Sequence, residues 1–278
     1  MSAGLESEET ILEELMKKES AEKIDIIDAI IKYRHFKKIK DFIENLLNSR
    51  KGSRMFSLVT ETWNPVTGCN HYCIYCWARR LALTKLKNTK KYRNGFKPAI
   101  HPNEFKKKFS GGIVFVTDMG DLFSSTVPRE WILKVIRYTA KFSDTYFLFM
   151  TKNPMRYHEF LDEFPPNAIL GATIETDRDD LYYKHKISQA PPPSERYIAM
   201  KTLDWDKKFI SIEPILDFDL ENFSKWIEEI SPIMVYIGYD NYGWKLPEPP
   251  LNKTLELIDK LREITIVIKK TIRKAWNE

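Results

Sequence analysis

The chain contains only three cysteines, Cys69, Cys73 and Cys76, and all of them lie within eight residues. An odd, clustered set of cysteines is not the framework of a disulfide-stapled domain. Cysteines this close in sequence would also close small, strained rings if they paired. The cysteines therefore indicate ligation of a metal or an iron–sulfur cluster, and no further cysteine remains for a second cluster.

The spacing of the three cysteines is C-x3-C-x2-C, and Gly68 directly before them suits a tight loop around a bulky group. Iron–sulfur cubanes are usually held by four protein thiolates, so three thiolates leave one iron open to a small molecule. The alternative is a zinc site of three cysteines and His71. Structural zinc normally joins two separated ligand pairs, so the spacing favours a [4Fe–4S] cluster, with His71 as a loop residue.

After Gly52 the sequence alternates short apolar runs with helical stretches. Strands are expected at residues 55–59, 112–117, 145–150, 168–174, 209–212 and 233–237, with a seventh run at 264–268. Helices are expected near residues 77–87, 128–142, 154–163, 178–188, 219–230 and 252–263. Short β-branched strands that alternate with helices indicate a parallel α/β sheet buried on both faces.

A length of 278 residues fits one such domain, since a complete α/β barrel takes about 250 residues. Six or seven strand–helix units predict a partial barrel of the (β/α)6 type over residues 51–278. The alternative is an open Rossmann-like sheet, but no glycine-rich dinucleotide fingerprint follows any expected strand. The prolines of Pro191–Pro193 are interpreted as a stiff loop.

Residues 1–50 are predicted to form a helical N-terminal extension of two or three amphipathic helices, because apolar residues recur there at helical spacing. This extension would cap one end of the barrel or dock a partner. Its first residues are acidic and lack the basic-then-apolar order of a signal peptide. No apolar run reaches the roughly 18 residues that span a bilayer, so we expect a cytoplasmic protein.

Positive charge is concentrated directly after the cysteines. The chain has a formal net charge of +5, yet residues 79–108 carry eleven basic residues against the single acid Glu104. Such a stretch suits a polyanionic partner, although runs of charge are more often a solvated surface. Tyr92, Phe96 and Phe105 lie among these lysines and would either stack on bases or anchor the segment to the core.

Several blocks of the sequence carry a resemblance to a known family. They are TWNPVTGC at residues 62–69, His101-Pro102, FVTDMGDLF at 115–123, MTK at 150–152, LGATIET at 170–176 and SIEP at 211–214. In this order they resemble a phage-associated family of radical-SAM-like proteins, and more distantly spore photoproduct lyase. The chain departs from the family pattern at residues 238–243 and at Lys269-Lys270-Thr271.

The resemblance implies the fold of a radical S-adenosylmethionine (SAM) partial barrel. It also implies that the [4Fe–4S] cluster reductively cleaves SAM to a 5′-deoxyadenosyl radical, which abstracts hydrogen from a substrate. The substrate would be a nucleic acid or a nucleotide, with a peptide or small metabolite as the second choice. The electron donor would be a reductase or a protein of the flavodoxin or ferredoxin type.

The resemblance also implies roles for polar residues at the carboxyl ends of the expected strands, where such barrels place their sites. Lys152 and Glu213 are the candidate catalytic residues, meeting the SAM carboxylate or the substrate. The candidate SAM-binding residues are Tyr75, Thr117, Asp118, Thr173, Glu175 and Gly238. For each polar residue, an interior hydrogen-bonding role is the alternative, and Asp121 would instead cap the helix that follows it.

A function of another class remains open, in which the chain is a non-catalytic iron–sulfur electron carrier or a redox sensor that binds nucleic acid. Electron carriers usually take four cluster ligands from the protein. Three cysteines together with a series of polar strand ends favour catalysis.

Overall fold

The computed structural model describes residues 56–278, so the expected extension over residues 1–50 lies outside the described residues. One seven-stranded sheet, in which every neighbouring pair is parallel, dominates the described part. Its order is β1 (Glu61–Trp63), β4 (Ile113–Val116), β5 (Tyr146–Thr151), β6 (Ala168–Thr173), β7 (Lys208–Ile212), β8 (Met234–Ile237) and β9 (Ile266–Lys269). The order follows the chain, which is the topology of a partial α/β barrel, and the seventh strand is confirmed.

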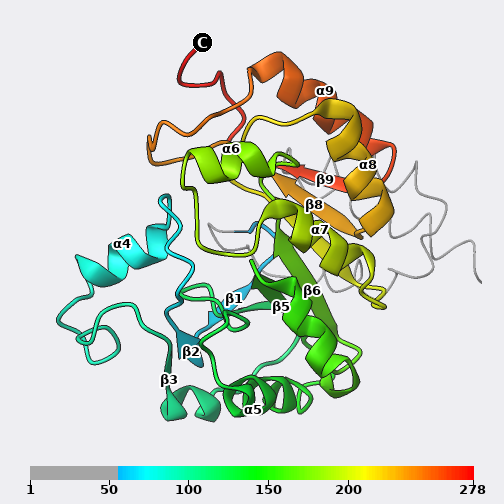
Figure 1. The fold of residues 1–278 in the computed structure, drawn as a ribbon. Helices are drawn as coiled ribbons and strands as arrows, with labels where there is room; N and C mark the ends of the chain where they lie inside the picture. The colour runs from blue at the N-terminus through cyan, green and yellow to red at the C-terminus, as the bar shows by residue number, and fades with distance from the viewer. Residues whose placement is uncertain (1–55) are drawn as a thin grey trace, which may run out of the picture.

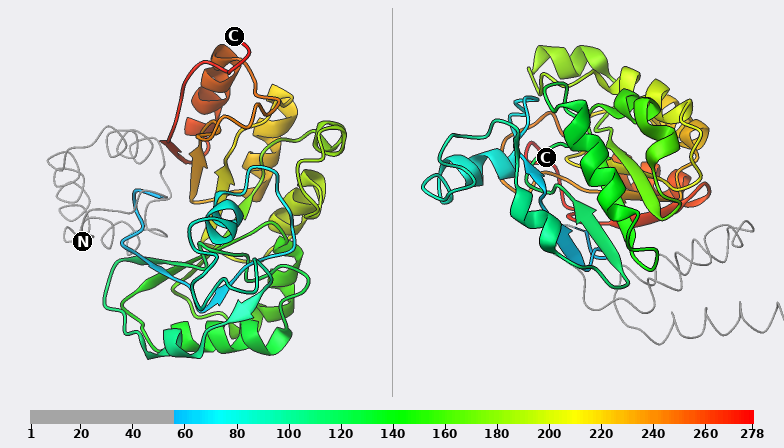
Figure 2. Two further views of the ribbon diagram at one scale, coloured as in Figure 1. Left: turned by 90° about the vertical axis from the view of Figure 1, so that its left-hand side faces the viewer. Right: turned by 90° about the horizontal axis from the view of Figure 1, so that it is seen from below.

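Helices cover the outer face of the curved sheet (Figures 1 and 2). They are α5 (Arg129–Thr139), the 3-10 segment η3 (Pro154–Glu163), α6 (Asp179–Lys184), α7 (Pro193–Lys201), α8 (Leu220–Ile230) and α9 (Leu251–Arg262). Alternate strand residues such as Val114, Phe147 and Val235 point outward and form one buried cluster with these helices. Helix α4 (Trp77–Leu83) projects away from the sheet at the left of Figure 1.

Residues at the start of the described part of the chain pack against the inner face of the sheet. Phe56, Leu58 and Val59 form a second buried cluster with inward residues of the strands, among them Phe115 and Leu148. Phe56 lies 5.4 Å from Phe115 between ring centroids. The interior of the barrel is therefore a packed core at this level rather than a pore.

This arrangement corrects the expected first strand at residues 55–59. Residues 56–59 form no strand, and the first strand is β1, two residues further along. The alternating apolar side chains of this segment have the pattern of a strand, but they fill the barrel interior instead of pairing with β4. Periodicity cannot distinguish these two forms of burial, because both bury alternate side chains.

Two further expectations need correction. The helix expected at residues 154–163 is a 3-10 helix. Pro193, interpreted as part of a stiff loop, is the first residue of α7, a helix that the sequence analysis did not list. Proline at the first position of a helix costs no hydrogen bond, so a proline run can precede a helix directly. Among residues 56–278, no helix is both long and apolar enough to cross a membrane.

Candidate active site

A cavity of about 520 Å3 opens at the carboxyl ends of the strands, above the packed interior. Nine of the eleven residues expected in the site line it: Cys69, Cys73, Tyr75, Cys76, Thr117, Asp118, Lys152, Thr173 and Glu213. Phe56, Phe115 and Met150 also line the cavity, and the first two belong to the packed interior below it. The structure thus gathers these side chains from four strand ends, those of β4, β5, β6 and β7, and from the cysteine loop around one space.

The cysteine loop is held in place by a close backbone contact at Gly68. Gly68 has φ +78°, and a Cβ atom there would lie 2.4 Å from the carbonyl oxygen of Lys97. On its other side it pairs with Gly120, where a Cβ would lie 2.7 Å from the Gly68 nitrogen. Only glycines allow three backbone segments to approach this closely, so the loop after β4 fixes where the cysteines begin.

The residues before Gly68 have structural roles that explain the TWNPVTGC block. Trp63 is fully buried, and its indole nitrogen donates to the carbonyl oxygen of Glu104. Asn64 donates to Asp118 at 2.5 Å and accepts from the backbone nitrogen of Met119. The short ribbon of β2 (Val66–Thr67) and β3 (Ala99–Ile100) then ties the loop to the basic segment.

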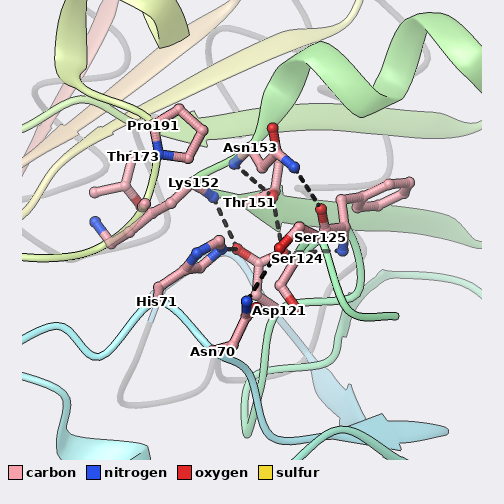
Figure 3. A network of polar contacts seen from close by, with 12 residues as sticks. Asn70, His71, Asp121, Ser124, Ser125, Thr151, Lys152, Asn153, Thr173 and Pro191 are labelled. Atoms are coloured by element: carbon pink, nitrogen blue, oxygen red, sulfur yellow. Dashed lines mark hydrogen bonds and ion pairs between the residues drawn. The ribbon is translucent and has the colours of Figure 1, made fainter. Parts of the chain in front are cut away.

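A buried hydrogen-bond network joins the cysteine loop to two strand ends (Figure 3). His71 Nε2 donates to Asp121 Oδ2 at 2.9 Å. The same carboxylate accepts from the Thr151 hydroxyl at 2.7 Å and from the backbone nitrogen of Lys152 at 2.8 Å. Burial opposes the charge of Asp121, but His71 and these donors hold the pKa of its carboxyl below the ordinary value. His71 is therefore engaged as a loop anchor.

The thiols lie in partly enclosed surroundings that suit a cationic ligand. Cys76 precedes α4, and its sulfur accepts from the backbone nitrogen of Arg79. Cys73 is hydrogen-bonded to Ser188 at 3.2 Å. Burial raises the pKa of Cys69, and it raises the pKa of Cys76 to about 11. Such thiols stay protonated alone, whereas coordination to iron would deprotonate them.

Within the described part of the chain, no three His, Cys, Asp or Glu side chains converge closely enough to hold a single metal ion. Ligands of a single zinc ion must approach one point at about 2.3 Å. Thiols that bind three different irons of a cubane need not meet at one point. Three cysteines on one loop beside a cavity therefore fit a cluster ligand set.

Thr117 is the clearest candidate for contact with a bound cofactor. It follows β4 directly, adopts φ +66°, and is only 2% exposed. Thr117 lines the cavity, and its buried hydroxyl finds no hydrogen-bond partner within the described residues. A strained backbone and an unsatisfied buried hydroxyl are each costly and are typical of functional sites. Burial also raises the pKa of the neighbouring Asp118, which Asn64 opposes in part.

Glu175 lies behind the cavity wall. It is fully buried and does not line the cavity. One carboxylate oxygen accepts from Tyr75 and from Lys152 Nζ at 2.5 Å, and the other accepts from Arg196 at 2.7 Å. Burial alone would raise the pKa of Glu175, but Arg196 and Lys152 lower it to about 2. The structure therefore gives Glu175 interior partners and places Tyr75 and Lys152 between it and the cavity.

Glu213 faces the cavity beside a second lysine. Its Oε1 lies 2.8 Å from Lys270 Nζ, and its Oε2 accepts from Ser211. Burial raises the pKa of Glu213, although Lys270 opposes the shift. Gly238 does not line the cavity. A Cβ there would lie 3.2 Å from the Cβ of Lys270, so this glycine allows the segment after β9 to pack closely.

Sequence reasoning missed Asn64, Ser188, Arg196 and Lys270, which support the site from a distance along the chain. For the aromatics of the basic segment, the structure decides between the two alternatives. Tyr92 and Phe96 are buried in a small core with Ala78 and Ala82, and Phe105 packs edge-on against Trp63. All three rings anchor the segment to the core, and Phe96 also lines the cavity.

Among solved structures, the chain is similar to spore photoproduct lyase complexed with dinucleoside spore photoproduct. The TM-score is 0.51 at 11% identity, covering 76% of this chain and 63% of that chain. A mutant of the same lyase with bound AdoMet and dinucleoside spore photoproduct gives a TM-score of 0.50 at 11% identity, with the same coverage. The chain thus spans just under two thirds of the length of these lyase chains. At this identity the similarity shows the fold alone, a partial α/β barrel with a parallel sheet.

The structure of Streptococcus suis SuiB bound to precursor peptide SuiA is a weaker match, with a TM-score of 0.48 at 12% identity. The match covers 85% of this chain and 52% of that chain. No curated protein sequence matches the chain. A family model described as "Protein of unknown function (DUF5131)" matches residues 55–228, which include all three cysteines and the ends of β4, β5, β6 and β7. The chain belongs to this family.

Proposed function

We propose that the protein is a radical SAM enzyme in which Cys69, Cys73 and Cys76 hold a [4Fe–4S] cluster. One observation carries the proposal: the three thiols and the polar strand ends line the same cavity. When bound, the cluster would supply the electron that breaks the S–C5′ bond of SAM, giving methionine and a 5′-deoxyadenosyl radical that abstracts hydrogen from the substrate.

The polar groups nearest the cysteine loop suit the charged end of SAM. The Thr117 hydroxyl is free to bind a ligand, and Asp118 offers a carboxylate to the ammonium group of SAM. Thr173 lines the same cavity from the end of β6. Gly238 and Glu175 do not line it, so we propose that they support the site through the segments that they pack against.

Lys152 is the proposed partner of the SAM carboxylate or of an anionic group on the substrate. Its ammonium group donates one hydrogen bond to Glu175 and lies 5.2 Å from the Tyr75 ring centroid. The remaining N–H groups are available to the cavity, since an ammonium group has three. The buried Glu175 fixes the direction of this side chain, and fixed donors in a water-poor site bind anions more strongly than mobile ones.

Glu213 and Lys270 would meet the substrate or the far end of SAM as a charge pair. Because burial raises the pKa of Glu213 while Lys270 keeps it in check, the carboxyl can hold or release a proton at modest cost. The apolar side chains of Phe56, Phe115 and Met150 would exclude water from the radical, which otherwise reacts with whatever lies close.

The proposal includes a partner that delivers electrons, namely a reductase or a protein of the flavodoxin or ferredoxin type. The competing function is a non-catalytic iron–sulfur carrier or sensor. A carrier has no use for a cavity of about 520 Å3 beside its cluster ligands, lined by Thr117 with its unsatisfied hydroxyl and by four acids. This observation favours catalysis.

The test is SAM cleavage by anaerobically reconstituted protein with dithionite, followed as 5′-deoxyadenosine. Thr117→Val keeps the shape of the side chain but removes the hydroxyl, so we expect the KM for SAM to rise about 2- to 12-fold with the cluster intact. Thr139→Val is the matched control, because that buried hydroxyl donates to Ile136 on α5. No 5′-deoxyadenosine from cluster-loaded wild-type protein would refute the proposal.

A further inference from the structure

Two arginine–aromatic pairs lie on segments whose neighbouring residues line the cavity, among them Cys73, Ala78 and Tyr242. Arg79 lies over the ring of Tyr72 at 4.7 Å, and Arg80 lies over the ring of Trp244 at 6.0 Å. The second pair joins α4 to the loop after β8, two segments that are far apart in the sequence (Figure 1). Tyr242, on the same loop, also lines the cavity. We call these five residues, Tyr72, Arg79, Arg80, Tyr242 and Trp244, the rim.

The aromatic side chains of the rim are exposed. Tyr72 is 47% exposed, Tyr242 is 54% exposed and Trp244 is 37% exposed. Exposed large aromatic side chains that gather beside a cavity are typical of a binding surface, and one of these three, Tyr242, lines the cavity itself. Their amphipathic rings contribute large contact areas with few rotatable bonds.

The backbone holds these rings in position. Tyr72 adopts φ +50°, an uncommon conformation for a bulky residue, between the anchored His71 and Cys73. On the other side, the Asp240 carboxylate accepts from the backbone nitrogens of Tyr242 at 3.1 Å and Trp244 at 2.7 Å. A backbone that is strained, or held by hydrogen bonds to a side chain, next to a site indicates that the site is preorganised for a ligand.

The charge of the rim determines which ligand fits. Within residues 56–278, neither Arg79 nor Arg80 forms an ion pair with an acid. They begin the segment of residues 79–108, whose one acid, Glu104, is already paired with Lys91 and Lys107. Unpaired arginines next to exposed aromatics recognise phosphates and the faces of bases together.

We infer that the rim binds single-stranded nucleic acid, stacking bases on Tyr72, Tyr242 and Trp244 while Arg79 and Arg80 contact phosphates. The inference rests on the proposed function for its chemistry, and it makes a nucleotide unit of the bound strand the substrate class. A base inside a duplex cannot reach a buried cavity without leaving its stack. Single strands therefore bind more tightly than duplexes.

The binding test uses fluorescence anisotropy of the full chain with labelled 12-mers: single-stranded DNA, single-stranded RNA and a DNA duplex. We expect single strands to bind at least tenfold more tightly than the duplex. Whichever of single-stranded DNA and RNA binds more tightly is the nucleic acid that the rim recognises. Trp244→Ala should weaken binding about 5- to 100-fold, the effect of losing one base–aromatic stack. Arg79→Gln with Arg80→Gln should flatten the slope of log K against log salt by about 1.4.

Matched controls lie on the outer helices. Trp226→Ala removes a half-buried aromatic that stacks on Tyr197, and Lys225→Glu reverses an exposed charge beside it on α8. Both should bind the oligonucleotides as wild type does. The thermal melting of each variant shows that it is folded.

Four results would overturn the inference: no salt-dependent binding, equal binding of duplex, an equal loss in the control variants, or tighter binding of poly-glutamate than of any oligonucleotide. The same protein is assayed for 5′-deoxyadenosine without oligonucleotide. If SAM is cleaved but no strand binds, the rim inference fails alone. If strands bind through the rim but SAM is not cleaved, the proposed function fails and the rim remains a nucleic-acid surface.

Discussion

His71 Nε2 donates to Asp121 Oδ2 at 2.9 Å, and this buried hydrogen bond connects the cysteine loop to the end of β4. It places the loop relative to the sheet, because the same carboxylate is bound by Thr151 and by the backbone of Lys152 at the end of β5 (Figure 3). A histidine between the first and second cysteines thus positions the loop that carries the proposed cluster ligands, and its own imidazole is engaged by Asp121.

Replacing this histidine should loosen the cluster loop. His71→Ala leaves the buried Asp121 carboxylate without its imidazole donor, and we expect the free energy of unfolding to fall by about 1–3 kcal/mol. Iron content after reconstitution should fall as well. His158→Ala is the control, since His158 Nε2 donates one hydrogen bond to the Ala199 carbonyl oxygen, away from the loop. Equal iron content in both variants would contradict the positioning role.

The close contact at Gly68 predicts a large effect of one methyl group. Gly68→Ala places a Cβ 2.4 Å from a backbone oxygen in a left-handed conformation, so overpacking and strain add to a loss of about 3–5 kcal/mol. Gly111→Ala is the matched control. Gly111 has a similar φ of +66° but meets nothing within 4 Å, so only the strain of about 1–2 kcal/mol remains. Denaturant unfolding measures the free energy of unfolding of both variants. Similar losses in the two would contradict the close contact at Gly68.

The buried pair of Glu175 and Arg196 predicts a stability change with a defined pH dependence. The pKa of Glu175 is lowered to about 2 from an ordinary value of 4.5. A lowered carboxyl pKa contributes stability that is present above pH 4.5 and is lost as the pH falls toward 2. Arg196→Met removes the partner and leaves a buried charge, so at pH 7 we expect a loss of about 3–5 kcal/mol.

The control for this pair is Arg178→Met, because Arg178 pairs with Asp217 at the surface and is 40% exposed in its side chain. Surface ion pairs contribute about 0–1 kcal/mol. Urea unfolding at pH 7 and pH 3 separates the two variants. If Arg196→Met costs no more than the control, Glu175 does not depend on this cation.

The Glu213–Lys270 pair predicts the opposite pH dependence. The pKa of Glu213 is raised in the folded chain, so its contribution to stability is full below the ordinary carboxyl pKa and is lost as the pH rises through the raised value. Lys270→Met removes the attraction that limits this shift. We expect that variant to be less stable at pH 7 than at pH 5, and Glu213→Gln in the same background to abolish the difference. A pH-independent loss would contradict the pairing.

Much of the fold is predictable from the sequence, because the strands of a parallel sheet are short apolar runs such as residues 145–150 and 233–237. The strand predicted at residues 55–59 is wrong because the apolar side chains of residues 56–59 pack inside the barrel and the segment pairs with no strand. Helix α7 was overlooked because it starts at Pro193, inside a proline run. The pattern of apolar residues along a segment predicts which side chains are buried, but it does not predict which backbone groups the segment hydrogen-bonds to.

The site is predictable only as far as it follows the strand ends. Thr117, Asp118 and Lys152 reach the cavity because carboxyl ends of parallel strands meet at one edge. Arg196 and Lys270 were missed because each meets its glutamate from another part of the chain, 21 residues away in the case of Arg196. The rim aromatics Tyr242 and Trp244 lie in a loop without any periodic signal.

Anaerobic reconstitution of the full chain with iron and sulfide, followed by addition of dithionite and SAM, shows whether the three cysteines hold a cluster that cleaves SAM. The proposal predicts about four irons per chain, iron–sulfur absorption, and 5′-deoxyadenosine formed at the expense of SAM. Each of Cys69→Ala, Cys73→Ala and Cys76→Ala should lose the cluster and the product together. Tightly bound zinc without iron–sulfur absorption, or a loaded cluster that leaves SAM intact, would contradict the account.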